Sequence, residues 1–183
     1  MIAENEMVLY GSHGVCRVAG TVTREFDGKE ALYYVLEPVF AGAFTVFVPV
    51  DSPAVSAKMR RILTSDEIHE MIRKMPEEEP LTFDDPAQQK AVCTRILRSG
   101  DRRELIRLIK TLHQRQKARR EQHKKPCVQD DRFMKEAERQ LYDEFAFVLN
   151  LSPEEVLPYI LKELEKPSRD PRESMPAPIL RSD

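Results

Sequence analysis

The sequence contains no tryptophan, only six glycines and only three cysteines among its 183 residues. So few glycines, all in turns or helix breaks, leave no glycine-rich loop of the kind that cradles a phosphate. The cysteines, Cys16, Cys93 and Cys127, are odd in number and far apart, which favours a reduced cytoplasmic protein over a disulfide framework. No apolar run approaches the ~18–20 residues of a membrane span. We therefore expect no membrane segment, and no signal peptide at the acidic N-terminus.

Catalytic and metal-binding patterns are also missing. His13 and Cys16 lie three residues apart near a turn, but no second Cys/His pair stands at ligand spacing. The run Glu77-Glu78-Glu79 lies between prolines, which indicates a solvated linker rather than an acid/base pair. We predict neither enzymatic activity nor a bound metal or cofactor.

The formal net charge of −2 hides an uneven distribution. Residues 84–125 carry 13 basic and 5 acidic side chains, whereas the net charges of residues 1–60, 61–83 and 126–183 are −2, −3 and −5. A basic stretch between acidic flanks is typical of a surface that contacts a polyanion. A solvated helix face rich in lysine and arginine would give the same pattern, and the sequence pattern does not separate the two.

The first 63 residues have the pattern of short antiparallel strands. Asp27-Gly28 is a strong hairpin signal between two runs rich in β-branched and aromatic residues. The expected strands are Met7–Tyr10, Val15–Phe26, Lys29–Glu37, Ala43–Val50 and a short one near Arg61-Ile62-Leu63. Together they predict a small, strongly bent sheet or an SH3-like antiparallel β-barrel.

From Thr64 onward the apolar residues follow the period of helices. The predicted helix starts are a capping box at Thr64, Asp85 before Pro86, Asp101 after Gly100, a helix beginning near Asp130, and Ser152 before Pro153. We thus expect an α+β protein of two domains, the second an all-α bundle of about five helices. The predicted division is a β domain at 1–63, a short helix and acidic linker at 64–80, a helical domain at 81–166, and a disordered tail at 167–183.

One strand has an aromatic residue on its outer face. In Ala43–Val50 the alternation assigns Phe44 and the following valines to the core, and it points Phe47 outward. An exposed aromatic on a strand near a sheet edge suits a docking surface to which a partner adds a strand.

Several short motifs occur in the order seen in one known family. They are Val8-Leu9-Tyr10, His13-Gly14-Val15, Val18, Arg24, Gly28, Tyr34-Val35-Leu36 and Thr45-Val46-Phe47-Val48-Pro49, then Ser99-Gly100-Asp101 and Ala137…Leu141…Glu144. In this combination the chain resembles the CarD/CdnL family of bacterial transcription regulators over roughly residues 5–165. These proteins bind RNA polymerase.

The resemblance implies a role for each half. The N-terminal Tudor-like domain would dock on the β1 lobe of the polymerase β subunit, with Arg24, Thr45, Val46 and Phe47 at the contact. A second family arginine falls at Phe47, so that contact would be apolar or absent. The helical domain would contact promoter DNA at the upstream edge of the −10 element and stabilise the open complex without reading a specific sequence. The expected DNA-contacting residues are Lys90, Arg95, Arg98, Arg102, Arg103 and Arg107.

The missing tryptophan is a departure from the family, because well-known members insert one into the minor groove. Pro86 falls at its position and Phe83 is the nearest aromatic, so these two are the expected wedge. An alternative is an adaptor whose helical domain contacts another protein instead of DNA. In either case we expect a cytoplasmic monomer that joins the nucleoid through polymerase.

Overall fold

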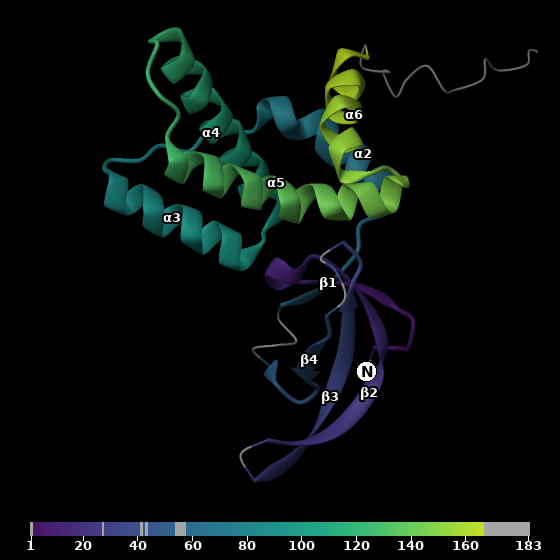
Figure 1. The fold of residues 1–183 in the computed structure, drawn as a ribbon. Coiled ribbons are helices and arrows are strands. Elements are labelled where there is room, and N and C mark those ends of the chain that lie inside the picture. The colour runs from purple at the N-terminus through teal and green to yellow at the C-terminus, as the bar shows by residue number, and fades with distance from the viewer. Residues whose placement is uncertain (1, 27, 41, 43, 54–57, 167–183) are drawn as a thin grey trace, which may run out of the picture.

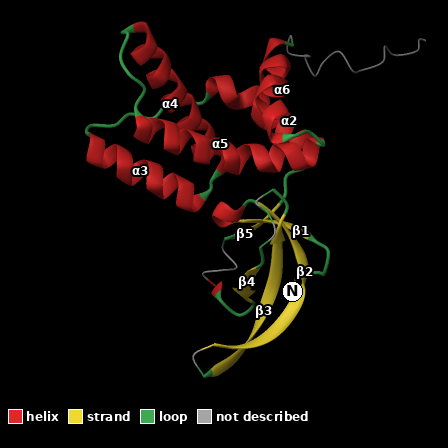
Figure 2. Ribbon diagram, viewed as in Figure 1, coloured by secondary structure: helices red, strands yellow, loops and turns green. Residues whose placement is uncertain are grey.

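The computed structural model describes residues 2–26, 28–40, 42, 44–53 and 58–166. An antiparallel sheet forms the N-terminal half, and a helical bundle follows it in the chain and lies at one end of the sheet (Figures 1 and 2). The α+β layout expected from the sequence is therefore confirmed. None of the helices in the described part of the chain is long and apolar enough to cross a membrane.

The sheet has five strands in the order β4-β3-β2-β1-β5, with every neighbouring pair antiparallel. The strands are β1 (Met7–Tyr10), β2 (Val15–Phe26), β3 (Lys29–Pro38), β4 (Val46–Pro49) and β5 (Met59–Arg61). Among the described residues no ladder joins β4 to β5, so the sheet is open and these strands are its two edges. The bent sheet is present, and its closure into a barrel stays a prediction.

The core of the sheet is built from alternate residues on one face. Its buried members are Val8, Cys16, Val18, Tyr34, Leu36 and Val48. Burial raises the pKa of the Cys16 thiol to about 11, so this cysteine is an apolar core residue rather than a nucleophile. Phe44 was expected in this core, but β4 begins only at Val46, and Phe44 lies ahead of the strand with 44% of its surface exposed.

Five helices follow in the described residues, each near its predicted start. They are α2 (Ser65–Lys74), α3 (Pro86–Ser99), α4 (Arg102–Glu121), α5 (Val128–Leu149) and α6 (Pro153–Glu165). The capping boxes at Thr64 and Ser152 and the side-chain caps from Asp85 and Asp101 are all formed. Gly100 ends α3 in the left-handed conformation, at φ +58°.

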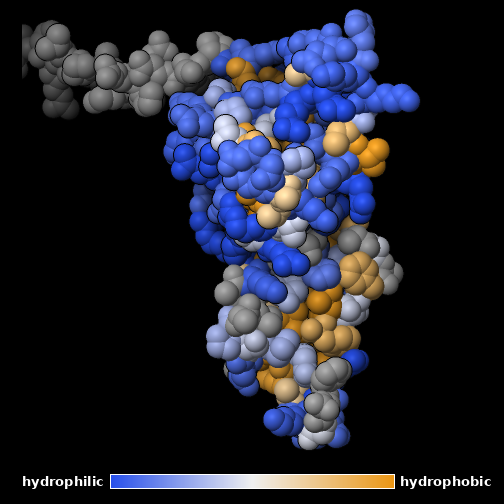
Figure 3. Space-filling model, turned by 90° about the vertical axis from the view of Figure 1, so that its left-hand side faces the viewer, coloured by the Kyte–Doolittle hydropathy of each residue, from blue (hydrophilic) through white to orange (hydrophobic). Residues whose placement is uncertain are grey.

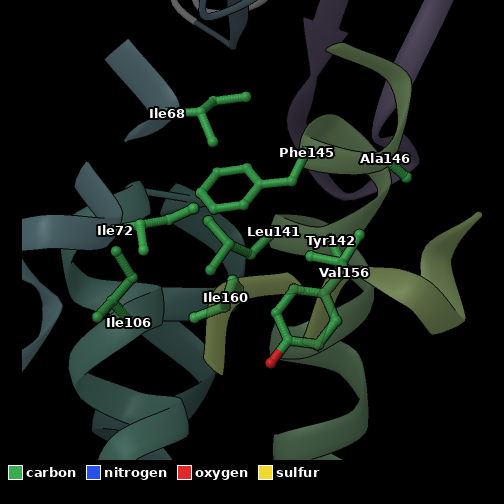
Figure 4. Packing of buried hydrophobic residues seen from close by; sticks show 9 residues of the cluster. All are labelled: Ile68, Ile72, Ile106, Leu141, Tyr142, Phe145, Ala146, Val156 and Ile160. Carbon is green, nitrogen blue, oxygen red and sulfur yellow. The ribbon is translucent and has the colours of Figure 1, made fainter. Parts of the chain in front are cut away.

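Helix α5 is the spine of the bundle and contacts the other four helices. Around its C-terminal half, Leu141 and Phe145 meet Ile68 and Ile72 of α2 and residues of α6 in one apolar cluster (Figure 4). Around its N-terminal half, Ala137 packs with the buried faces of α3 and α4. Each end of α5 therefore has its own core.

Residues 64–80 are bound to the bundle. Helix α2 is buried at Ile68 and Ile72, and the acidic stretch after it lies against α4. Glu78 pairs with Arg103 at 2.6 Å and its side chain is only 12% exposed, so the expectation of a solvated linker is wrong for this residue. The domain boundaries stay predictions, and the expected disordered tail, 167–183, lies outside the described residues.

Polar contacts join the sheet to the bundle. Glu144 of α5, 1% exposed, accepts two hydrogen bonds of 2.7 Å from Arg102 and one of 3.0 Å from the backbone N–H of Leu63. Arg102 also donates to the carbonyl of Arg61, and Arg60 donates to the carbonyl of Gly100 at 2.6 Å. Because Glu144 is buried and Arg102 nearly so, these contacts hold the sheet at a defined angle to the bundle.

Candidate functional site

The β4 edge brings together two of the residues predicted to contact a partner. Strand β4 pairs with β3 on one side, and in the described residues its other side has no strand partner. The guanidinium of Arg24, from β2, lies 3.7 Å from the centre of the Phe47 ring. Thr45 is exposed beside them, whereas Val46 packs partly against the core of the sheet.

This arrangement suits the addition of a strand. The unpaired side of β4 offers backbone donors and acceptors to an extended segment of a partner. Arg24 covers the ring of Phe47 by a cation–π contact, and a guanidinium in that position keeps N–H groups free for a carboxylate or carbonyl. The β4 edge therefore combines backbone pairing, an apolar ring and a positive charge.

The predicted DNA-contacting residues of α4 are engaged within the protein. Arg102 was expected on an exposed face, but its side chain is only 15% exposed and pairs with Glu144. Arg103 pairs with Glu78, and Arg107 donates to the carbonyl of Glu79 at 2.9 Å. Lys110, Arg115 and Arg119 of the same helix likewise bond to protein groups. We call these six residues the α4 basic face. The side chains of Lys117 and Arg120, near the end of the same helix, are exposed and have no such partner among the described residues.

Helix α3 presents its predicted cations differently. The side chains of Lys90 and Arg98 are exposed and have no hydrogen-bond or ion-pair partner in the part of the chain that the structure describes. Arg95 is also exposed, but it forms two hydrogen bonds, of 2.9 and 3.0 Å, with Glu104. The structure thus separates the six predicted DNA contacts into two free cations and four that are already bonded.

A groove of about 890 Å³ runs between α3 and α5, and we call it the α3–α5 groove. Its lining includes Lys90 and Thr94 on one side and Arg132, Lys135 and Arg139 on the other. Arg132 is exposed and has no ion-pair partner among the described residues, Lys135 pairs with Asp131, and Arg139 pairs with Glu136.

The α5 side of this groove was not found from the sequence. Residues 126–183 are acidic as a whole, and their net charge of −5 concealed three cations on one face of α5. The signal that could have found them is the spacing of Arg132, Lys135 and Arg139, three and four residues apart.

The one acidic residue that lines the groove is held ionised by its neighbours. Burial acts to raise the pKa of Glu136, but hydrogen bonds from Arg139 and Gln140 hold it below its ordinary value. Its single negative charge is therefore balanced by Arg139, and the remaining cations give the groove a positive potential.

The two expected wedge residues have different surroundings. Phe83 packs against the cluster formed by α3, α4 and α5, and the guanidinium of Arg115 lies 5.9 Å from its ring centre. Pro86 is exposed at the first position of α3. Phe83 would have to leave its packing to enter DNA, and the wedge stays a prediction.

Surface character also differs between the two halves. Seen from the side on which α3 lies, the helical half is mostly hydrophilic, and apolar surface gathers on the sheet half (Figure 3). Among the residues described, no group of three or more His, Cys, Asp or Glu side chains is placed to hold a metal ion.

Comparison with known proteins finds a match for the sheet half of the chain. A family model described as the CarD-like/TRCF RID domain matches residues 2–63, which include the whole sheet. No curated protein matches the chain. Residues 2–63 are thus similar to the RID domain of CarD-like proteins, the domain through which those proteins interact with RNA polymerase.

Proposed function

We propose that this protein is a transcription regulator that docks on the RNA polymerase β subunit through the β4 edge and contacts promoter DNA through its helical half. The RID domain at residues 2–63 is the observation that carries the proposal, because domains of this kind interact with RNA polymerase. The Tudor-like form of the sheet and its contact with the β1 lobe belong to the same proposal and rest on the resemblance.

The β4 edge supports the docking step. A segment of the β subunit would pair with the free side of β4, and Arg24 would meet an acidic or carbonyl group of that segment. Phe47 takes the place of a family arginine, so at this position the contact is apolar.

The α3–α5 groove supports the contact with DNA. Lys90 and Arg132 of the groove, with Arg98 beside it on α3, would neutralise phosphates and release counterions, which gives salt-sensitive affinity without sequence information. The polar contacts around Glu144 hold this groove at a fixed angle to the docking edge, so binding of polymerase would present it to the upstream edge of the −10 element. Tighter binding to the open than to the closed complex would shift the promoter toward opening.

A binding measurement with the isolated β subunit tests the docking step. Charge reversal in Arg24→Glu should weaken binding at least about tenfold, since it turns an attraction at the interface into a repulsion. Arg73→Glu, at an exposed site on α2, carries the same charge change and should leave affinity unaltered. Equal affinities for the two variants would remove the β4 edge as the docking site.

One observation favours the alternative function, an adaptor whose helical half contacts another protein instead of DNA. Six cations of α4 are bonded to protein groups, which lowers the positive charge available to DNA below what the sequence indicates. Footprinting of a promoter with polymerase, with and without this protein, separates the two readings. Added protection of upstream DNA supports the DNA contact, and an unaltered footprint supports an adaptor.

A further inference from the structure

A cleft of about 650 Å³ lies between the sheet and the bundle. From the sheet half it is lined by Tyr10, Gly11, His13 and Lys58, and from the helical half by Thr94, Leu97, Arg98, Phe133, Glu136 and Gln140. Neither half alone contains it, and the Arg60 and Glu144 contacts hold its two sides together. We call it the interdomain cleft.

The interdomain cleft continues into the α3–α5 groove. The two share Thr94, Leu97, Phe133 and Glu136, and a shallower hollow along α3 shares Arg98 with the cleft and Lys90 with the groove. Seven lysine and arginine side chains line these three hollows, against one acidic side chain among the described residues. Arg95, Lys135 and Arg139 are paired with carboxylates, and the other four have no ion-pair partner in the described part of the chain: Lys58, Lys90, Arg98 and Arg132. A continuous cationic path therefore leads from the far end of α3 to the sheet.

Aromatic rings stand at the sheet end of this path. Tyr10 and His13 are stacked, with ring centres 5.7 Å apart and planes 6° from parallel. Phe44 meets the His13 ring edge-on at 6.1 Å, and its exposure of 44% leaves the ring accessible. Phe133 lines the opposite wall. Rings beside a cationic groove form a stacking platform for unpaired bases.

The wall of the cleft also contains a polar atom without a partner. Gln140 is 5% exposed, and its Nε2 donates to the carbonyl of Leu97 and to Glu136. Its Oε1 accepts no hydrogen bond from any described residue. A buried acceptor left in this state is costly, and this one is closed to solvent and lies beside Gly100, at the junction of sheet and bundle.

We propose that the interdomain cleft and the α3–α5 groove together bind single-stranded DNA. This inference rests on the proposed DNA contact and adds which form of DNA is preferred. The bases of a duplex are stacked on one another and cannot lie on Tyr10, His13 and Phe44, whereas those of a separated strand can. The cations would follow the backbone of the strand, and the rings would hold its bases at the sheet end. A protein bound in this way would oppose reclosure of an open promoter.

Fluorescence anisotropy of the full chain tests this preference at low ionic strength. The probes are a labelled oligothymidylate of about 12 nucleotides and a duplex of the same length. We expect the single strand to bind at least about tenfold tighter than the duplex. Lys58→Gln/Arg98→Gln should abolish that difference, and the charge-matched Arg73→Gln/Lys162→Gln control should keep it. Phe44→Ala, at an exposed ring, should weaken single-strand binding about fivefold and leave duplex binding unchanged.

Each other outcome has a definite meaning. Equal affinity for both probes, with the cleft variant no weaker than its control, overturns the single-strand path and leaves the DNA contact standing. Binding of neither probe overturns both this inference and the DNA part of the proposed function. Tighter binding of an oligouridylate than of the DNA strand would assign the path to RNA and contradict the inference. Thermal unfolding of each variant separates lost binding from a lost fold.

Discussion

The six cations of the α4 basic face are all bonded to protein groups, whereas the α3–α5 groove keeps unpaired cations. On α4, Arg102, Arg103 and Arg107 are bonded to Glu144, Glu78 and the carbonyl of Glu79. In the groove, Lys90 and Arg132 have no such partner in the described part of the chain. The number of cations on a helix therefore does not measure how many are available to a ligand. Availability depends on the acidic segments that pack beside them.

The two regions also differ in what their charges do for the fold. Arg102 and Glu144 are desolvated, so each depends on the other, and loss of either leaves a buried charge. The groove cations are exposed and contribute little to stability, so their cost to the fold is small and a phosphate can reach them. The Arg102–Glu144 pair orients the two halves, and the unpaired groove cations are available for binding.

The largest expected effect comes from separating the buried pair. Glu144→Gln leaves Arg102 without its counter-charge between the halves and weakens the bond to the Leu63 backbone. We expect the free energy of unfolding to fall by about 3 kcal/mol. Denaturant titration followed by circular dichroism measures it.

A double variant tests whether the lost stability comes from the unpaired charge of Arg102. Arg102→Met/Glu144→Leu removes both charges and keeps side chains of similar size, so it should recover much of the lost stability. If Glu144→Gln unfolds like the unaltered protein, Arg102 is not held by Glu144 and the distinction between the two regions fails.

A smaller effect should follow from freeing one cation of the α4 basic face. Glu78→Gln removes the partner of Arg103, whose side chain is 76% exposed. DNA affinity should rise about threefold, because one more cation can reach a phosphate and counterions are released on its binding. Anisotropy with duplex DNA checks this, and Glu70→Gln, which frees Lys74 on α2, is the matched control. The same rise in both variants would mean that only net charge matters.

The smallest expected effect concerns the exposed pair at the start of α2. Hydrogen bonds from Arg61 and from the Thr64 backbone lower the pKa of Glu67 to about 2, below its ordinary value of 4.5. The folded state therefore holds this proton more weakly than the unfolded chain, so the stabilisation is present above pH 4.5 and is lost as pH falls toward 2. Glu67→Gln should flatten the fall of the thermal midpoint in that range. An unaltered pH profile would show that this exposed pair adds nothing to stability.

The local features of this fold were predictable from the sequence. Asp85 and Asp101 cap their helices through the residue three positions on, and Gly100 supplies the left-handed turn between them. These signals act over a few residues, and the helix starts were found for that reason.

Contacts between distant segments were not predictable in the same way. Arg102 was placed on an exposed face because its helix has an apolar stripe elsewhere, but its partner Glu144 lies 42 residues away. Glu78 was assigned to a solvated linker because proline and glutamate surround it, and only the position of α4 binds it to Arg103. The α3–α5 groove forms only because α5 packs against α3, and no local sequence pattern predicts that packing.

The contact between Arg24 and Phe47 was predictable only in part. Both residues were identified as contacts, one by resemblance and one also by the alternation of its strand. Their stacking across the sheet follows from the order β4-β3-β2, which places both strands beside β3. The β4 edge was therefore predicted as a set of residues but not as a geometry.

The salt dependence of DNA binding tests the central distinction most directly. Lys90→Gln/Arg98→Gln/Arg132→Gln removes three charges from the groove and the α3 surface beside it, and we call it the groove variant. Arg103→Gln/Arg107→Gln/Arg119→Gln removes the same charge from the α4 basic face. The slope of log affinity against log salt should decrease by about 2 to 3 for the groove variant and by less than about 1 for the α4 variant. Equal decreases, or a larger one for α4, would contradict the assignment of DNA binding to the α3–α5 groove.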